Sequence, residues 1–419
     1  MVYFGGEAVK SNRAAWILIG SQSISIAGDS LLLIVLPLLV FDLTGSAFEV
    51  SVVFILTELP NFFGFFSGVL RRYFSPKQLV ILYDAGRFFI LLFLTVVEIY
   101  GYNSTYLIYC MFFLINIFST FFRPTRIELI TQLVDKSQLK KFNSLDQTFE
   151  ATAMAIGLGL GGYAYHYLSL EWIFFCNALT FFVSGFVMLM IKSIKSTKDV
   201  SENNSKFTLS YFWKMSIRVS KQKQTSFLVF GEALAGGAVG IFIAIFVVYA
   251  KQYLQVDSIT IGHMEMIQSI FAICTGMLIA LNFIRISERS LGVCGYLGMG
   301  ICMIVIGITT SIPLVYLLMA IIGLFNMMYS IAVRTLLQTS VQKEEVIHVF
   351  ALESILSRSA SIVGALVAGS LISLFSITAN WVIFYSGLIL LIVSLWGYRN
   401  LFSNQNVYHI DGNRGEKNV

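Results

Sequence analysis

The stretch Lys192–Gln224, KSIKSTKDVSENNSKFTLSYFWKMSIRVSKQKQ, separates two long apolar regions of the chain. It carries eight Lys or Arg residues against two acidic ones, whereas the sequence on either side is apolar almost without interruption. We interpret it as a basic cytoplasmic linker between two membrane-embedded halves. Phe207, Tyr211 and Met215 recur in it at helical spacing, which favours a short amphipathic helix on an anionic membrane surface over a solvated tether.

The composition is that of an integral membrane protein. Hydrophobic residues make up 57% of the 419 residues, charged residues 12%, and the mean hydropathy is +0.79. This leaves too little polar surface for a soluble protein of this length. A membrane-spanning helix needs about 20 apolar residues. By this measure the sequence predicts twelve spans, at 15–41, 47–70, 78–99, 105–132, 142–166, 171–191, 225–250, 259–284, 290–311, 313–336, 348–374 and 379–400.

The predicted fold is all-α, with twelve transmembrane helices in two pseudo-symmetric six-helix halves. Residues 1–191 form the N-terminal half and 225–402 the C-terminal half, joined by the linker at 192–224 and followed by a cytoplasmic tail at 403–419. Shifting the second half back by 208 residues brings several residues into register, as expected of the parallel repeat in one large transporter architecture. The matched pairs are Gly28 and Gly236, Gly68 and Gly276, Arg126 and Arg334, Phe142 and Phe350, and Gly161 and Gly369.

Basic residues gather on one side of the predicted membrane. With the N-terminus inside, the inner segments hold Arg71, Arg72, Lys77, Lys136, Lys140, Lys141, Arg285, Arg289, Lys343 and the basic residues of the linker and tail. The outer loops carry none, and only Lys251 borders one of them. This asymmetry predicts that both termini lie in the cytoplasm and that the chain lies in the cell (cytoplasmic) membrane. It also explains the net charge of +5 without nucleic acid as a partner.

Ionisable residues within apolar spans normally face the interior of the helix bundle or a water-filled cavity. In this chain they recur in spans 1, 2, 4, 5, 7, 8, 10 and 11, as Asp29, Glu58, Arg126, Glu128, Asp146, Glu150, Glu232, Glu265, Arg334, Glu353 and Arg358. Span 3 carries Asp84, Arg87 and Glu98 only near its ends, and spans 6, 9 and 12 have none in their interiors. We therefore expect every third span to face lipid and the others to line a central cavity.

Three stretches of the sequence resemble a known family. They are QSISIAGD at Gln22–Asp29, LPLLVFDLTGS at Leu36–Ser46, and the FRP of Phe122–Pro124 leading through Asn143 and Ser144 to GLGLGG at Gly157–Gly162. With these stretches, the span count and the repeat, the chain resembles the major facilitator superfamily over essentially its whole length. Within that superfamily it resembles the macrolide-efflux-like branch of bacterial drug exporters. The resemblance implies a secondary transporter that alternates access by rocking its two halves around a midplane cavity.

One loop departs from the family pattern. The family's loop between spans 2 and 3 resembles Gly-x-x-x-Asp-Arg-x-Gly-Arg-Arg, whereas this chain has GVLRRYFSPK. Gly68 and the terminal base Lys77 are retained, but Arg72, preceded by Arg71, stands where the family has the acidic residue of its cytoplasmic latch. Asp84 and Arg87, one turn apart on span 3, are candidates for a substitute charge network that gates the cytoplasmic side.

Asp29, near the middle of span 1, is the first candidate for the transport mechanism. Gln22 and Ser25 precede it by seven and four residues, so the three side chains share one helix face. A carboxylate at that depth can bind and release a proton, and protonation removes most of its burial cost, which couples proton occupancy to helix movement. The same carboxylate suits a cationic or polar group of a substrate. The alternative is a structural hydrogen bond to a neighbouring helix.

Asp146 and Glu150 lie one turn apart on span 5, so their side chains are neighbours. Two close carboxylates tend to share a proton, and Arg126 of span 4 is placed in the same half of the membrane. A proton-coupling pair and a structural ion network are equally supported interpretations. The counterpart network in the second half, with the same two interpretations, is Arg334, Glu353 and Arg358.

Glu58 and Glu232 complete the candidates for substrate binding or proton coupling. Glu58 adjoins Pro60, whose missing N–H loosens span 2 beside an ionisable group. Glu232 precedes Gly236, Gly237 and Gly240, for which close helix packing is the favoured role.

Nothing in the sequence indicates an enzyme or a cofactor. The chain has no phosphate-binding loop, and its four histidines are scattered without metal-ligand spacing, so we expect no metal site. Its five cysteines lie within predicted spans and are interpreted as reduced packing residues.

We therefore predict a monomer that exports a hydrophobic or amphipathic small molecule, such as a macrolide, another drug or an endogenous metabolite, across the bilayer in exchange for protons. Drug antiporters of the family often carry Gly-Pro in span 5, where this chain has Gly157-Leu158. The direction of transport therefore follows from the branch resemblance alone. Two alternatives stay open: uptake of a solute coupled to protons or other ions, and a non-transporting membrane sensor built on a transporter fold.

Overall fold

The computed structural model describes residues 12–64, 69–102, 104–135, 138–190, 223–281, 283, 285–340 and 346–402. Gly68 of the predicted loop, the linker from residue 192 to 222 and the tail from residue 403 lie outside the described residues. The amphipathic helix predicted for the linker therefore stays a prediction.

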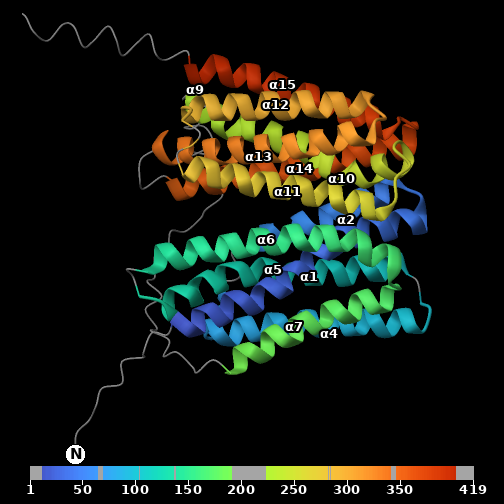
Figure 1. Cartoon of the computed structure of the whole chain (residues 1–419), viewed down its shortest axis with the longest axis vertical. Helices are drawn as coiled ribbons and strands as arrows, with labels where there is room; N and C mark the ends of the chain where they lie inside the picture. Colours follow the sequence, from blue (N-terminus) through green and yellow to red (C-terminus); the bar gives the residue numbers. More distant parts are fainter. Residues whose placement is uncertain are drawn as a thin grey trace, which may run out of the picture. The chain divides into compact units, whose positions relative to one another are not determined.

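Helices make up the first half of the chain (Figure 1). A long first helix, α1 (Asn12–Thr44), is followed by a short α2 (Ala47–Glu58), which continues as a 3₁₀ turn, η1 (Leu59–Phe63). The remaining members are α4 (Pro76–Ile99), α5 (Thr105–Leu133), α6 (Leu139–Tyr167) and α7 (Leu170–Met190).

The second half begins with a short α9 (Lys223–Ser226) and a π-helical turn, η3 (Phe227–Gly231), which lead directly into α10 (Glu232–Gln252). It continues with α11 (Ser258–Ala280), α12 (Glu288–Ile308), α13 (Ile312–Ser340), α14 (Val346–Phe375) and α15 (Ala379–Phe402). Hydrogen bonds from Thr260 hold the pKa of Asp257, in the loop before α11, below its usual range.

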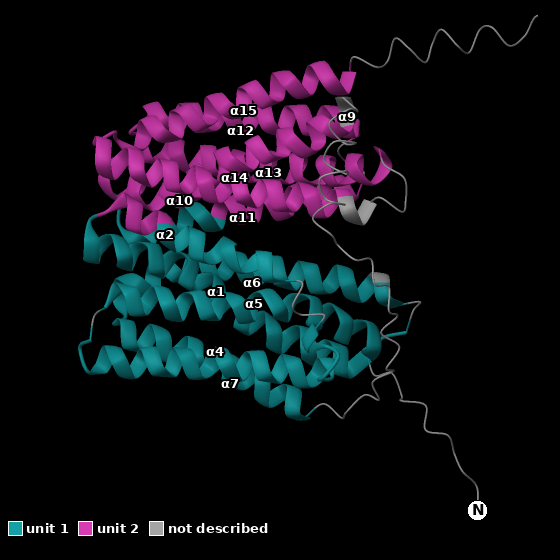
Figure 2. Ribbon diagram, turned by 180° about the vertical axis from the view of Figure 1, so that it is seen from behind, with its two compact units in different colours: residues 1–45, 52–204, 256–266 teal, residues 46–51, 205–255, 267–419 magenta. Residues whose placement is uncertain are grey.

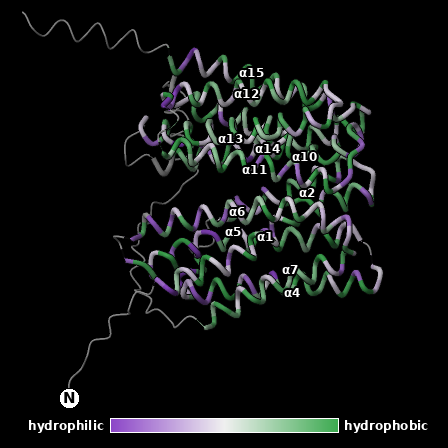
Figure 3. Tube along the Cα trace, viewed as in Figure 1, coloured by the Kyte–Doolittle hydropathy of each residue, from purple (hydrophilic) through white to green (hydrophobic). Residues whose placement is uncertain are grey.

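Helical segments cover all twelve predicted spans, and ten of the described helices are long and apolar enough to cross a membrane by themselves. Two helices, α2 and α6, fall short of this measure for reasons visible in their sequences. Helix α2 is only 12 residues long before its 3₁₀ turn. Helix α6 carries Lys141, Asp146 and Glu150 in its first turns. Hydrophobic residues predominate along most of the other helices (Figure 3).

The two halves repeat one another. Shifting α13 back by 208 residues gives 104–132, next to Thr105–Leu133 of α5, and α14 shifts to 138–167, next to Leu139–Tyr167 of α6. The helix partners repeat as well, because α1 packs against α6 as α10 packs against α14, and α4 packs against α7 as α12 packs against α15. The prediction of two pseudo-symmetric six-helix halves is confirmed.

The chain divides into two compact units (Figure 2). Unit 1 comprises residues 1–45, 52–204 and 256–266, and unit 2 comprises residues 46–51, 205–255 and 267–419. The beginning of α11 therefore belongs to unit 1, where it packs on α6 along a line of small residues. There the Ser258 hydroxyl donates to the carbonyl of Gly162 at 3.1 Å, and His263 Nε2 lies 2.9 Å from the Tyr163 hydroxyl.

The exposed faces of α4, α7, α12 and α15 are apolar, but α6, α11 and α14 also expose apolar side chains, so the prediction that every third span faces lipid stays a prediction. Phe89, Phe186, Ile301 and Leu395 are among the exposed side chains of these helices. Helix α4 differs from the prediction in one respect, because Asp84 and Arg87 lie within the helix and are buried. Its inward face thus carries charge, although its outward face is apolar.

Pro60 interrupts span 2, as the sequence predicts. The α-helical part of the span ends at Glu58, and Pro60 lies in the 3₁₀ turn that follows. The Asn61 side chain donates to the carbonyl oxygens of Thr57 and Glu58, at 3.3 and 3.2 Å. These bonds satisfy backbone acceptors at a helix break inside a membrane-spanning segment.

Candidate functional site

A charged cluster lies inside unit 1, where a side chain of α4 reaches across to α1. Arg87 of α4 binds two carboxylates: its Nη1 lies 3.0 Å from Asp29 Oδ2, and its Nη2 lies 2.5 Å from Asp84 Oδ1. Asp84 and Arg87 are three residues apart on one helix, so their side chains are neighbours. The predicted candidate on span 1 and the predicted pair on span 3 thus form one site, which we call the Asp29 cluster (Asp29, Asp84 and Arg87).

Two aromatic rings enclose the guanidinium of Arg87. Its central carbon lies 4.6 Å from the ring centroid of Phe122 on α5 and 4.2 Å from that of Phe181 on α7. Arginine stacks favourably on aromatic faces, and the interaction is strongest away from water. Since Arg87 is only 2% exposed, these rings and the two carboxylates fix its position.

The two carboxylates of the cluster have different surroundings. Asp84 is fully buried and also accepts hydrogen bonds from Ser184 Oγ at 2.7 Å and from Gln22 Nε2 at 3.4 Å. Gln22 also donates to Ser184 Oγ at 2.6 Å. The side chain of Asp29 is 27% exposed, and its other donor is Ser119, at 3.4 Å. Asp84 is therefore held by three donors away from solvent, whereas Asp29 is partly exposed and held by Arg87 and by the longer contact with Ser119.

The charges of the Asp29 cluster do not balance. Two carboxylates face one guanidinium, so the cluster carries one net negative charge when both acids are ionised. An uncompensated charge inside a membrane-spanning bundle is costly. One added proton makes the cluster neutral, and Asp29 is the member that is open to receive it.

Arg126 joins α5 to α6 in a second network of unit 1. Its Nη2 lies 2.9 Å from Asp146 Oδ2 and 2.5 Å from Glu150 Oε2. Arg123, whose side chain is 70% exposed, lies 3.1 Å from the other oxygen of Glu150. Two guanidinium groups thus balance two carboxylates. This geometry favours the structural ion network over a proton shared between Asp146 and Glu150.

Arg71 of the altered loop also has an acidic partner. Its Nε lies 2.9 Å from both carboxylate oxygens of Glu128 on α5, and its Nη1 donates to the carbonyl of Phe74 at 3.0 Å. Lys77 Nζ donates to the carbonyl of Leu189 on α7 at 3.3 Å. The Asp84–Arg87 pair expected to substitute for the family's latch lies in the Asp29 cluster instead, and Arg71–Glu128 is the ion pair formed by the loop.

Replacing Arg71 by methionine is expected to lower the free energy of unfolding by up to about 1 kcal/mol, the upper end for a partly exposed ion pair, because its contact with Glu128 is bidentate. A double-mutant cycle with Glu128→Gln, read from thermal unfolding in detergent, measures the coupling. The exposed neighbour Arg72, replaced by methionine, is the control and should leave stability unchanged. Additive effects of Arg71→Met and Glu128→Gln would show that the pair is energetically silent.

Unit 2 contains a different arrangement. Glu232, the first residue of α10, accepts a hydrogen bond from the Tyr296 hydroxyl on α12. Arg334 and Glu353 act on Glu232 electrostatically, and Glu353 is influenced in turn by Arg334 and Arg358. These predicted residues of the second half therefore lie near one another. The glycines after Glu232 pack on α14, where the Ser361 hydroxyl donates to the carbonyl of Gly236 at 2.7 Å.

Some predicted residues lie apart from these clusters, and some partners were not predicted. Glu58 lies at the end of α2, half-buried beside the helix break. The partners missed by sequence analysis are Arg123, which pairs with Glu150, and five neutral residues: Ser119, Phe122, Phe181, Ser184 and Tyr296. Serine and aromatic residues are common throughout this chain, so they give no signal until the helices are packed.

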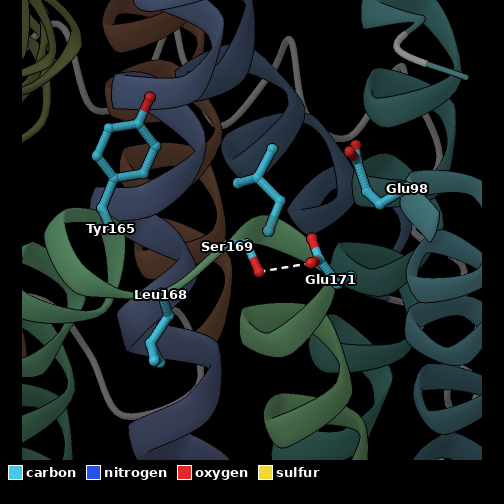
Figure 4. Close-up of a pocket in the computed structure, with 6 residues that line it drawn as sticks. Glu98, Tyr165, Leu168, Ser169 and Glu171 are labelled. Atoms are coloured by element: carbon cyan, nitrogen blue, oxygen red, sulfur yellow. Dashed lines mark hydrogen bonds between the residues drawn. The ribbon is translucent and has the colours of Figure 1, made fainter. Parts of the chain in front are cut away.

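An open surface pocket of about 420 Å³ lies at another place in unit 1, beside the C-terminal ends of α4 and α6 and the beginning of α7 (Figure 4). It is lined by Glu98, Tyr165, Leu168, Ser169, Leu170 and Glu171. Ser169 Oγ donates to Glu171 Oε1 at 2.5 Å, and the Tyr165 hydroxyl donates to Asp42 at 2.7 Å. None of the predicted site residues lines it.

Comparison with known proteins agrees with a membrane transporter. A family model described as Major Facilitator Superfamily matches residues 18–223 and 228–406. The chain therefore belongs to the major facilitator superfamily and is a multi-pass membrane protein of that family.

Two relatives from Bacillus subtilis (strain 168) are similar in sequence. The "Uncharacterized MFS-type transporter YfiS" is 26% identical over 184 residues, which is 43% of each chain. The "Uncharacterized MFS-type transporter YkuC" is 24% identical over 156 residues, or 35% of each chain. The similarity thus spans less than half the length of these relatives.

Solved transporters share the fold at low sequence identity. The nucleoside transporter NupG is similar with a TM-score of 0.74 and 9% identity, over 93% of this chain and 99% of that one. A bacterial homologue of the iron transporter ferroportin in an inward-facing state gives 0.67 and 15%, over 92% and 99%. At such identities the likeness concerns the fold and not the substrate.

Proposed function

We propose that this transporter exports a hydrophobic or amphipathic small molecule in exchange for protons, and that Asp29 carries the proton. The observation behind this proposal is the Asp29 cluster, in which one guanidinium serves two carboxylates and the less tightly held carboxylate is 27% exposed. The cluster is built to take up one proton and to become neutral when it does so.

Proton binding at Asp29 changes the ion-pair contacts of Arg87. With Asp29 ionised, Arg87 of α4 is joined to α1 by the ion pair between its Nη1 and Asp29, while its Nη2 pairs with Asp84 on its own helix. With Asp29 protonated, the bridge to α1 becomes a weaker hydrogen bond, and Arg87 is left as the ion-pair partner of Asp84 on its own helix. The proton therefore loosens the contact between α1 and α4. A change of this kind is what alternating access requires, since it gives protonation a differential effect on two arrangements of the helices.

The substrate class rests on the macrolide-efflux-like resemblance and on the apolar, aromatic character of the chain, in which Phe and Tyr number 37 and 19. Such surfaces suit adaptable recognition of hydrophobic solutes. Proton-coupled uptake is the second candidate, because Leu158 follows Gly157 where drug antiporters often carry proline.

Replacing Asp29 by asparagine is expected to abolish energised transport at equal protein level. The amide keeps the shape and a hydrogen-bonding oxygen near Arg87 but cannot exchange a proton. The measurement is efflux of macrolides and lipophilic dyes from energised cells, with a protonophore added in parallel. Asp42→Asn is the matched control, since it makes the same change at the exposed end of the same helix.

The outcomes separate the candidates. Protonophore-sensitive efflux by the wild type and Asp42→Asn, but not by Asp29→Asn, supports the proposal. Normal transport by Asp29→Asn would contradict the assignment of the proton to Asp29. Accumulation under an inward proton gradient would favour uptake, and a well-folded wild type that moves no compound in either direction would favour a membrane sensor.

A further inference from the structure

Glu232 is a second carboxylate with an unusual environment, and it lies in unit 2. It is half-buried at the beginning of α10 and accepts a hydrogen bond from the Tyr296 hydroxyl with an O···O distance of 2.5 Å. In the described part of the chain no lysine or arginine lies within salt-bridge distance of it. A neutral phenol, and not a cation, is therefore its direct partner.

Aromatic packing fixes the direction in which Tyr296 points. Its side chain is 1% exposed, its ring stacks on Tyr329 of α13 at 5.0 Å between centroids, and Phe227 meets it edge-on at 6.3 Å. Gly295 allows this stack, because a Cβ there would lie 2.7 Å from Tyr329 Cβ. The ring cannot turn away, so its hydroxyl stays directed at the carboxylate.

The backbone before Glu232 is also specialised. The π-helical turn η3 ends at Gly231, one residue before Glu232, and begins at Phe227, which packs on Tyr296. A π turn inserts an extra residue into a helix, changes the direction of the following side chains and is frequent at functional sites. This turn therefore positions both the Glu232 carboxylate and the ring of Phe227, which packs against Tyr296.

Among the described residues, none of the charged and titratable groups that face Glu232 is a cation in direct contact with its carboxylate. They are Tyr296 of α12, Tyr329 and Arg334 of α13, and Glu353 of α14. Arg334 and Glu353 act on it with opposite signs, and Glu353 competes for Arg334. Protonated Glu232 is neutral and still accepts the Tyr296 hydrogen bond, whereas ionised Glu232 is a negative charge in a membrane-spanning bundle without a contacting cation.

We propose that Glu232 and Tyr296 form a second proton-binding site of this transporter, built entirely from unit 2. The ligand is a proton, which the carboxylate takes from water and returns to it, with Tyr296 donating its hydrogen bond in both states. The site does not depend on Asp29, so this inference can hold whether or not Asp29 is the coupling residue.

Infrared difference spectroscopy of the purified full chain in lipid tests the proposal directly. Lowering the pH should produce carbonyl stretching bands of protonated carboxylic acids, and one of them should be present both in the wild type and in Asp29→Asn. Glu232→Gln should lose this band, although the amide can still accept the Tyr296 hydrogen bond and the protein should fold normally. Tyr296→Phe should shift the band to higher frequency, because the carbonyl loses its hydrogen-bond donor.

Two results would overturn the inference. If the spectrum of Glu232→Gln equals that of the wild type, Glu232 does not exchange a proton in the accessible pH range. If the band disappears in Asp29→Asn and persists in Glu232→Gln, the proton belongs to Asp29. That second result would leave the proposed function standing while removing the second site, so the two failures are distinguishable.

Discussion

Replacing Arg87 by methionine is expected to leave little folded protein. The side chain is 2% exposed and neutralises two carboxylates from within unit 1. Its removal leaves Asp29 and Asp84 facing each other without a counter-ion. Removing one partner of a buried ion pair typically costs about 3–5 kcal/mol, and here two acids lose the same partner. The measurement is the yield of monodisperse protein after detergent extraction, with thermal unfolding of whatever is recovered.

A second change separates charge imbalance from lost packing. Methionine preserves much of the volume between Phe122 and Phe181, so Arg87→Met combined with Asp84→Asn removes the fully buried carboxylate together with its counter-ion. This double variant should recover most of the wild-type yield while remaining inactive in transport. Arg399→Met, at an exposed arginine of α15, is the control. A folded, stable Arg87→Met single variant would mean that the carboxylates are neutral in the wild type and that Arg87 does not bridge them as an ion.

The helices could be predicted because length and hydropathy determine them almost completely. A span must carry about 20 apolar residues and must satisfy its own backbone hydrogen bonds, so apolar runs and their breaks show where helices begin and end. The repeat followed from the same signal, since one offset relates both halves. Span 2 is the least regular span, and its residue Pro60 predicted the end of the α-helix at Glu58.

The Asp29 cluster could be predicted only in part. Sequence analysis singled out Asp29, Asp84 and Arg87 because charges are rare in the spans, yet it assigned the last two to a cytoplasmic network. Position along a span does not reveal which neighbouring helix a side chain contacts, and that is decided by packing. The serine and aromatic partners could not be predicted for the same reason, because they contact the charged residues only after α1, α4, α5 and α7 are assembled; Gln22 was singled out, but its contact with Asp84 was not predicted.

Replacing Gly157 by alanine is the other change expected to be severe. This glycine of α6 faces α1, where an added Cβ would overlap the carbonyl oxygen of Ala27 and lie 2.8 Å from Ser30 Cβ. A backbone carbonyl cannot move aside as a flexible side chain can, so the two helices must separate. Overpacking of this kind typically costs about 1–3 kcal/mol. The same displacement shifts the part of α1 that carries Asp29, two residues beyond Ala27, and so disturbs its contact with Arg87.

We therefore expect Gly157→Ala to lower the thermal unfolding midpoint and also to impair transport. Gly20→Ala makes the same chemical change in α1, but nothing lies within 4 Å of its added Cβ, so stability and transport should be unchanged. If Gly157→Ala unfolds at the wild-type temperature, α1 and α6 do not meet at this position. If it is destabilised but transports normally per folded molecule, the spacing of α1 and α6 supports the fold without controlling the Asp29–Arg87 contact. A loss in both measurements, absent in Gly20→Ala, would show that the packing of α1 against α6 supports both the fold and the position of Asp29.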